Sequence, residues 1–142
     1  MIKSVAGIIF INNKYLFQVR DNKSSIWFPG FNGFFGGLVD KNETPNHAIK
    51  REILEELNTP VVKAKLLIKA NFQPSKLKQQ RERFYYLITL KKNFEKQLKI
   101  NEGSGFKFLS INQLKLSKMI PWDITAIYYH QLILSNKKFI PN

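Results

Sequence analysis

Apolar and polar residues alternate along much of this 142-residue chain with the spacing typical of β-strands, whereas two segments show helical spacing. Turn residues such as Asn12-Asn13, and clusters of Gly and Pro, separate the strand-like runs. These runs predict strands at residues 4–11, 14–20, 34–39, 61–72, 83–90 and 106–109. Apolar positions three and four residues apart predict helices at residues 45–57 and 120–134. The order β-β-β-α-β-β-β-α predicts an α/β fold with a mixed β-sheet between helices.

The first predicted helix has clear start signals and two contrasting faces. Pro45 suits the first helical position, and Thr44 before it is a good cap. At about 100° per residue, one face is apolar and faces a core. The apolar residues of this face are Ala48, Ile49, Ile53 and Leu57. Glu52, Glu55 and Glu56 share another face, where like charges three and four residues apart cost ~0.2–0.5 kcal/mol per pair. This repulsion predicts a bound cation.

Acidic residues are concentrated in this segment more than chance clustering explains. Four of the ten in the chain lie here: Glu43, Glu52, Glu55 and Glu56. The three helix carboxylates, with backbone oxygens of the Gly36-Gly37 turn, are hard ligands that suit Mg²⁺ or Mn²⁺. The chain has no cysteine and only two histidines, so we expect no soft-ligand metal site. The alternative is a solvated acidic face beside Lys50 and Arg51.

The segment from Gly37 to Thr59 resembles the signature of the Nudix hydrolases. That signature reads glycine, five residues, Glu, seven residues, Arg-Glu, an aliphatic residue, any residue, Glu-Glu, any residue, Gly and an aliphatic residue. Seven residues match at the right spacing: Gly37, Glu43, Arg51, Glu52, Ile53, Glu55 and Glu56. Two positions depart, because Asn58 replaces the closing Gly and Thr59 the closing aliphatic residue. Asn also suits a left-handed helix cap, and we expect Val61 to take over the buried contact.

The resemblance implies an α/β/α sandwich across the chain and hydrolysis of a pyrophosphate bond in a nucleoside diphosphate linked to another group. It implies Mg²⁺ or Mn²⁺ as the cofactor, held by Glu52, Glu55, Glu56 and the Gly36 carbonyl. Glu55 and Glu56 would also take part in catalysis. Arg51 would orient the carboxylates, while Glu43 braces the loop that Gly37 begins.

A further acidic residue lies in Asn101-Glu102-Gly103, before the predicted strand at residues 106–109. MutT-like Nudix hydrolases place an additional catalytic Glu in a comparable Glu-Gly loop. The resemblance therefore makes Glu102 a candidate metal ligand or general base, a role typically worth ~10²–10⁴ in rate. The alternative is a solvated turn glutamate.

Asp123, at the start of the last predicted helix, is the second candidate outside the signature. MutT-like enzymes that act on oxidised guanine nucleotides read the base with an Asn or Asp near this point. The resemblance therefore implies that Asp123 hydrogen-bonds a purine edge while Trp122 or Phe35 covers the ring. The alternative is a helix cap or a partner of the helix dipole.

Length and composition predict one domain, residues 1–142, in a reducing compartment. A chain of this size has room for one sizeable core, and the absence of cysteine excludes a disulfide framework. The apolar run at residues 5–11 is too short for a signal peptide, and the longest uncharged stretch, residues 24–39, is interrupted by Pro and Gly. We therefore expect a cytoplasmic protein without a membrane span.

The net charge of +13 suggests nucleic acid as a partner at first sight. However, Lys outnumbers Arg by nineteen to four, and Asn and Ile are also abundant, which is the pattern that AT-rich codons produce. The lysines are scattered and form no binding tail. We therefore expect a basic surface that attracts a polyphosphate substrate, without stable nucleic-acid binding.

These features lead to one principal hypothesis and several alternatives. The principal hypothesis is a metal-dependent hydrolase of a small nucleoside di- or triphosphate derivative. The role implied for Asp123 makes oxidised nucleotides the first substrate to test, and the five residues between Pro29-Gly30 and Gly36-Gly37 resemble the 8-oxo-dGTP-type branch. The alternatives are nucleotide-sugar or ADP-ribose hydrolysis, removal of RNA 5′ pyrophosphate, and a non-catalytic nucleotide sensor. The sequence does not determine whether the protein is a monomer or a homodimer.

Overall fold

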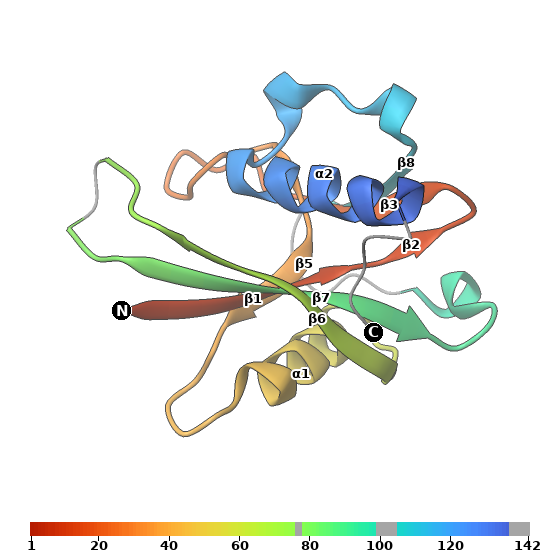
Figure 1. Ribbon diagram of the computed structural model, residues 1–142, viewed down its shortest axis with the longest axis horizontal. Helices are drawn as coiled ribbons and strands as arrows, with labels where there is room; N and C mark the ends of the chain where they lie inside the picture. Colours follow the sequence, from red (N-terminus) through yellow and green to blue (C-terminus); the bar gives the residue numbers. More distant parts are fainter. Residues whose placement is uncertain (76–77, 99–104, 137–142) are drawn as a thin grey trace.

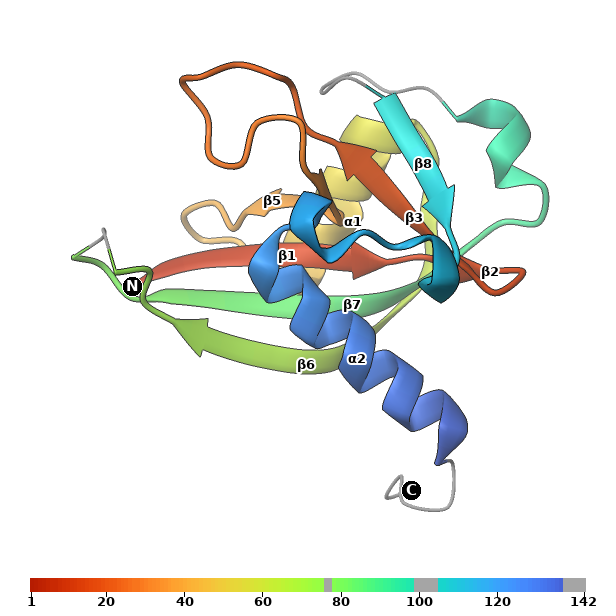
Figure 2. The same ribbon diagram turned by 90° about the horizontal axis from the view of Figure 1, so that it is seen from above.

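The computed structural model describes residues 1–75, 78–98 and 105–136. Two helices lie on opposite sides of a mixed four-stranded sheet (Figures 1 and 2). The sheet has the order β5-β1-β7-β6, with β1 and β7 parallel and the other neighbours antiparallel. Its strands are β1 (Ile2–Ile8), β5 (Phe35–Leu38), β6 (Val61–Phe72) and β7 (Arg81–Leu90). The helices are α1 (Pro45–Leu57) and α2 (Pro121–Ser135). The predicted α/β fold is confirmed.

A second, smaller sheet is built around β3. Its neighbours β2, β4 and β8 all pair with it antiparallel. The strands are β2 (Phe10–Ile11), β3 (Lys14–Val19), β4 (Asn32–Gly33) and β8 (Gly105–Leu109). Three short 3₁₀ helices complete the described elements: η1 (Phe94–Gln97), η2 (Ile111–Gln113) and η3 (Leu116–Lys118). The sequence pattern did not predict these short helices.

The predicted N-terminal hairpin is only partly correct. The turn forms as expected, with Asn12 and Asn13 both at positive φ, as tight hairpin turns require. The strand predicted at residues 4–11 is interrupted, however, because β1 ends at Ile8 and β2 begins at Phe10. β1 pairs with β5 and β7, whereas β2 pairs with β3. The chain therefore passes from one sheet to the other within this apolar run.

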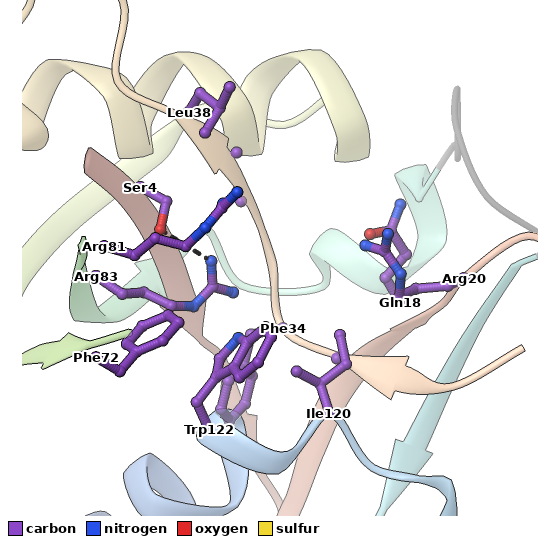
Figure 3. A pocket seen from close by; sticks show the side chains of 13 residues that line it. Ser4, Gln18, Arg20, Phe34, Leu38, Phe72, Arg81, Arg83, Ile120 and Trp122 are labelled. Carbon is purple, nitrogen blue, oxygen red and sulfur yellow. Dashed lines mark hydrogen bonds between the residues drawn. The ribbon is translucent and has the colours of Figure 1, made fainter. Parts of the chain in front are cut away.

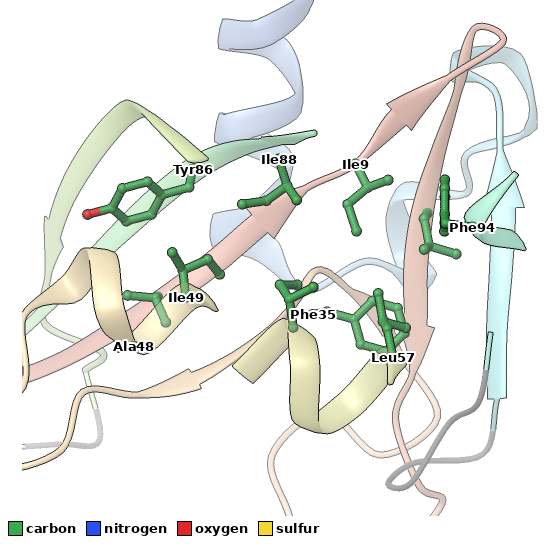
Figure 4. Close-up of a cluster of buried hydrophobic side chains, with 11 residues drawn as sticks. Ile9, Phe35, Ala48, Ile49, Leu57, Tyr86, Ile88 and Phe94 are labelled. Carbon is green, nitrogen blue, oxygen red and sulfur yellow. The ribbon is translucent and has the colours of Figure 1, made fainter. Parts of the chain in front are cut away.

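Apolar side chains fill the spaces under both helices. Figure 4 shows the cluster between α1 and the sheet, where Ile49 and Leu57 pack with Phe35, Ile9 and Ile88. A second cluster packs under α2. β1 contributes to both, since Val5 belongs to the first cluster and Ala6 to the second. Burial on both faces explains why residues 5–8 of β1 are continuously apolar rather than alternating.

Buried polar contacts fix α2 against β3. The Tyr15 hydroxyl lies 2.6 Å from His130 Nδ1, and Gln131 Nε2 donates to the same hydroxyl at 2.9 Å.

Within the three described ranges, no helix is both long and apolar enough to cross a membrane.

Candidate active site

Two glycines let β5 approach both β1 and α1. Gly36 has a φ of +153°, and a Cβ there would overlap the Val5 carbonyl oxygen. A Cβ on Gly37 would overlap the Glu52 carboxylate. The absence of side chains therefore allows a carboxylate of α1 to lie directly against the β5 backbone.

Both ends of α1 form as the sequence predicts. The Thr44 side chain accepts a hydrogen bond from the His47 backbone N–H, and Asn58 adopts the left-handed conformation of a C-cap at φ 55°. Thr59 departs from our expectation, because it is itself fully buried whereas Val61 is only half-buried. Thr59 thus fills the position that Val61 was expected to take over.

Arg51 is the centre of a network that holds the acidic face together. Its Nε and Nη2 donate to the two carboxylate oxygens of Glu43 at 2.8 and 2.9 Å, a bidentate pair. Its Nη1 donates to Glu52 at 2.8 Å and to Glu55 at 3.3 Å. Nη2 also donates to the Leu38 carbonyl oxygen at 3.0 Å, which connects α1 to the end of β5. One guanidinium thereby orients three carboxylates.

Glu43 connects this network to the loop that precedes α1. Besides binding Arg51, its carboxylate accepts a hydrogen bond from the Asp40 backbone N–H at 3.0 Å. The hydrogen bonds from Arg51, and then that from Asp40, lower the pKa of Glu43 to about 2. Glu43 is therefore ionised whenever the protein is folded at neutral pH.

Glu52 and Glu56 form the buried part of the acidic face. Glu56 is 5% exposed, and its carboxyl group shares a hydrogen bond with that of Glu52. Burial raises the pKa of Glu52, although the hydrogen bond from Arg51 opposes this effect. Two carboxyl groups in contact with little exposure to water need either a shared proton or a cation between them. Glu55 is different, because its side chain is 58% exposed.

The donor chemistry of this face fits a hard divalent cation. Glu52, Glu55 and Glu56 offer carboxylate oxygens and no competing soft ligand. In the part of the chain that the structure describes, no three acidic or histidine side chains are already arranged around a common metal position. Glu52 and Glu55 instead contact Arg51, so metal binding would exchange some of these contacts for the cation.

A pocket of about 170 Å³ lies beside the two glycines of β5 (Figure 3). Gly36, Gly37 and Leu38 line it, so it shares its β5 wall with the carboxylate face. Its aromatic lining is Phe34, Phe72 and Trp122. Its polar lining is Ser4, Gln18, Arg20, Arg81 and Arg83.

Asp123 lies behind this pocket and is completely buried. It accepts hydrogen bonds from the Phe34 backbone N–H at 3.0 Å, from the Tyr85 hydroxyl at 2.8 Å and from Arg83 Nε at 3.3 Å. Burial alone would lower the pKa of Arg83, but Asp123 and Tyr85 together outweigh this effect and the pKa is raised. Asp123 does not cap α2, since the residue at the cap position is Ile120 and no side-chain cap bond forms.

The two aromatic residues predicted to cover a ligand ring, Trp122 and Phe35, lie in different parts of the structure. Trp122 lines the pocket and stacks on Phe72, with ring centroids 4.9 Å apart and an interplanar angle of 23°. Phe35 is fully buried in the cluster under α1 (Figure 4) and does not line the pocket. Because side chains alternate across a strand, Phe34 reaches the pocket and Phe35 does not. The expectation for Phe35 is therefore corrected in favour of Phe34.

The sequence did not point to Ser4, Arg20, Arg81 or Arg83 as site residues. The rarity of arginine could have indicated the three arginines among them, since the chain has only four arginines among twenty-three basic residues. Three of them line the pocket and the fourth is Arg51. Glu102, the predicted additional ligand or base, lies outside the described residues.

Comparison with known proteins gives a consistent result. The family model described as "NUDIX domain" matches residues 1–129. The MutT NUDIX hydrolase from Burkholderia pseudomallei is 19% identical, with a TM-score of 0.77 over 90% of this chain and 96% of that one. The E. coli ORF135 protein is 21% identical, with a TM-score of 0.79 over 99% and 95%. The E. coli dihydroneopterin triphosphate pyrophosphohydrolase is 16% identical, with a TM-score of 0.71 over 94% and 95%. No curated protein sequence matches the chain.

Proposed function

The chain belongs to the NUDIX domain family, and we propose that it cleaves a nucleoside di- or triphosphate derivative at the carboxylate face of α1, with the base in the adjoining pocket. It is a pyrophosphohydrolase acting on acid anhydrides, a class that uses divalent metal ions and small nucleotide substrates. The observation that carries the proposal is that β5 borders both the carboxylate face of α1 and the pocket. Gly37 contacts Glu52 on one side and lines the pocket on the other.

Each residue of the acidic face has a role in this proposal. Glu52, Glu55 and Glu56 would hold Mg²⁺ or Mn²⁺, with the Gly36 carbonyl as a further oxygen donor. The metal would neutralise charge on the phosphoryl oxygens and activate water. Arg51 keeps Glu52 and Glu55 oriented and is itself fixed by Glu43. Glu55 is the exposed carboxylate and can reach substrate or water; we assign catalysis to Glu55 and Glu56, with Glu102 as an additional base to test.

The substrate assignment changes with the placement of Asp123. Oxidised guanine nucleotides were the first choice because Asp123 was expected to read a purine edge. Its oxygens already accept three hydrogen bonds, and the side chain is sealed from solvent. We therefore assign Asp123 a positioning role, holding Arg83 at the pocket, and we propose unmodified nucleoside triphosphates as the first substrates to assay.

A nucleotide panel tests this function. Purified protein is incubated with nucleoside triphosphates, nucleotide sugars, ADP-ribose and triphosphorylated RNA, with Mg²⁺, with Mn²⁺ and with EDTA, and the products are separated by chromatography. We expect monophosphate and pyrophosphate from a triphosphate only when metal is present. Metal-dependent cleavage of the sugar nucleotides or of RNA alone would move the assignment to those substrates. No metal-dependent cleavage of any of them would support the non-catalytic sensor.

A further inference from the structure

The polar lining of the pocket consists mainly of hydrogen-bond donors. Arg20, Arg81 and Arg83 present guanidinium groups, which donate and cannot accept. Ser4 and Gln18 are the only other polar side chains of the lining, and the Ser4 hydroxyl accepts from Arg83 Nη1 at 3.4 Å. None of the described lining residues is a carboxylate. A ligand edge in this pocket therefore meets mainly donors, and the Gln18 amide is the side chain that can both donate and accept.

The arginines are held at fixed positions on two walls. Arg83 comes from β7 and is fixed by Asp123 behind it and by Ser4 at its side. Figure 3 shows Arg81 and Arg83 next to each other on one wall, with Arg20 and Gln18 on the opposite wall. Arg20 is anchored through its Nε, which donates to the Trp27 carbonyl oxygen at 2.8 Å. Their orientation precedes ligand binding.

Arg81 has donors to spare. Its guanidinium lies over the Trp27 ring, 5.1 Å from the ring centroid. Its Nε is buried and makes no hydrogen bond within the described part of the chain. A buried donor without an acceptor is costly, by about 1–3 kcal/mol. A ligand acceptor at the Arg81 guanidinium would offset this cost.

The size of the pocket restricts what it can hold. Sites for whole small molecules usually measure about 300–1,000 Å³, so about 170 Å³ suits one part of a nucleotide. Phe34, Phe72 and Trp122 supply aromatic surface for a flat ring. A nucleobase satisfies both the size and the aromatic lining.

We propose that this pocket selects guanine through its O6 and N7 acceptors, read by Arg81 and Arg83, and rejects both adenine and 8-oxoguanine. Paired contact of an arginine with O6 and N7 is the commonest specific contact to guanine. Adenine presents an amino group beside N7, which would face a guanidinium. 8-Oxoguanine carries a hydrogen on N7, so it places a donor against donors. Cytosine also has neighbouring acceptors, but its single ring offers less surface to the three aromatic side chains.

The inference rests on the proposed function for the identity of the ligand, yet it is testable without turnover. The two tryptophans of the chain, Trp27 and Trp122, both belong to this region. Quenching of tryptophan fluorescence therefore reports directly on occupancy of the pocket. Nucleoside monophosphates are titrated without metal, which separates base recognition from cleavage.

The experiment compares dGMP with dAMP, 8-oxo-dGMP and dCMP. We expect dGMP to bind at least about tenfold more tightly than each of the others, the discrimination typical of a paired arginine contact. Equal or tighter binding of dAMP, 8-oxo-dGMP or dCMP would overturn the inference, as would the absence of quenching by all four. Cleavage without base preference would overturn it while leaving the proposed function intact.

A matched pair of variants assigns the effect to the pocket. Arg81→Gln and Lys107→Gln each remove one positive charge, but Lys107 lies on β8 and does not line this pocket. Arg81→Gln should weaken dGMP binding about tenfold and leave dAMP binding unchanged, whereas Lys107→Gln should change neither. Equal losses in the two variants would show that only net charge matters and would contradict a role for Arg81 in base reading. Circular dichroism checks that both variants are folded.

Discussion

The acidic face of α1 and the pocket lined by Arg20, Arg81 and Arg83 are built in opposite ways. On α1, one cation, Arg51, contacts the carboxylates of Glu43, Glu52 and Glu55. At the pocket, one anion, Asp123, accepts from Arg83, Tyr85 and the Phe34 backbone. The side chain of Arg51 is 28% exposed and that of Asp123 is 0% exposed. Water and ions reach the first network and are excluded from the second.

This difference makes the Arg51 network on α1 an adjustable region and the Asp123 network behind the pocket a fixed region. Partly exposed ion pairs contribute little to stability and are readily exchanged, as the binding of a metal ion to Glu52 and Glu55 requires. A buried pair that loses one partner leaves an uncompensated charge, which is strongly destabilising. We therefore expect changes on α1 to affect activity more than stability, and changes at Asp123 to affect stability first.

The largest effect is expected for Glu56→Gln. The substitution removes the charge of a proposed metal ligand but leaves a side chain of the same shape, which can donate to Glu52. Metal-dependent kcat should fall by ~10²–10⁴, while the melting temperature without metal stays the same or rises because a repelling carboxylate is gone. Steady-state kinetics and thermal melting measure the two effects. Turnover close to wild type would remove Glu56 from the catalytic site.

Asp123→Asn tests the fixed region. It leaves the largely buried guanidinium of Arg83 without its anion, so the free energy of unfolding should fall by ~3–5 kcal/mol. Asp21→Asn, in an exposed pair with Lys23 whose N···O distance is 3.9 Å, is the matched control and should change stability by less than about 0.5 kcal/mol. Urea denaturation gives both values. Similar small losses in the two variants would show that the Asp123 network does not hold the pocket.

Arg51→Lys has a smaller expected effect, confined to the adjustable region. Lysine keeps the charge but cannot make the bidentate contact with Glu43 while reaching Glu52 and Glu55. Residues that orient metal ligands typically contribute 10–100-fold in metal affinity, so the Mg²⁺ concentration for half-maximal activity should rise by about that factor. Isothermal titration with Mn²⁺ provides an independent value. An unchanged metal dependence would mean that Arg51 does not orient the ligands.

The smallest effect is a pH dependence at Glu43. Its pKa is about 2 in the folded protein against 4.5 for an ordinary glutamate. A lowered pKa contributes stability that is fully present above about 4.5 and is lost as the pH falls toward about 2. The difference in melting temperature between wild type and Glu43→Gln should therefore be constant near neutral pH and shrink across this acidic range. A difference that is independent of pH down to about 2 would contradict the Arg51 contact.

The same contrast explains which part of the site could be predicted from the sequence. The acidic face comes from one continuous segment, where helical spacing and the Thr44 and Asn58 caps determine which side chains share a face. The pocket depends on long-range pairing. Ser4 meets Arg83 because β1 and β7 are parallel in that register, and no local spacing encodes this pairing.

The fold likewise has features that local sequence predicts and features that it does not. The bounds of α1 and β6 agree with the predicted ranges, because periodicity and capping are local. The break at Ile9 and the separation of Phe34 from Phe35 were not predicted. Both depend on which sheet face or helix lies opposite, which is decided by packing of the whole chain.

Diffraction from a crystal grown with Mn²⁺ and a non-hydrolysable dGTP analogue tests the account most directly, because the anomalous signal locates the metal while the same map shows the base. The account predicts manganese among the carboxylates of Glu52, Glu55 and Glu56, with guanine in the pocket against Trp122 and its O6 and N7 toward Arg81 and Arg83. Manganese bound away from α1, or a base outside this pocket, would contradict it.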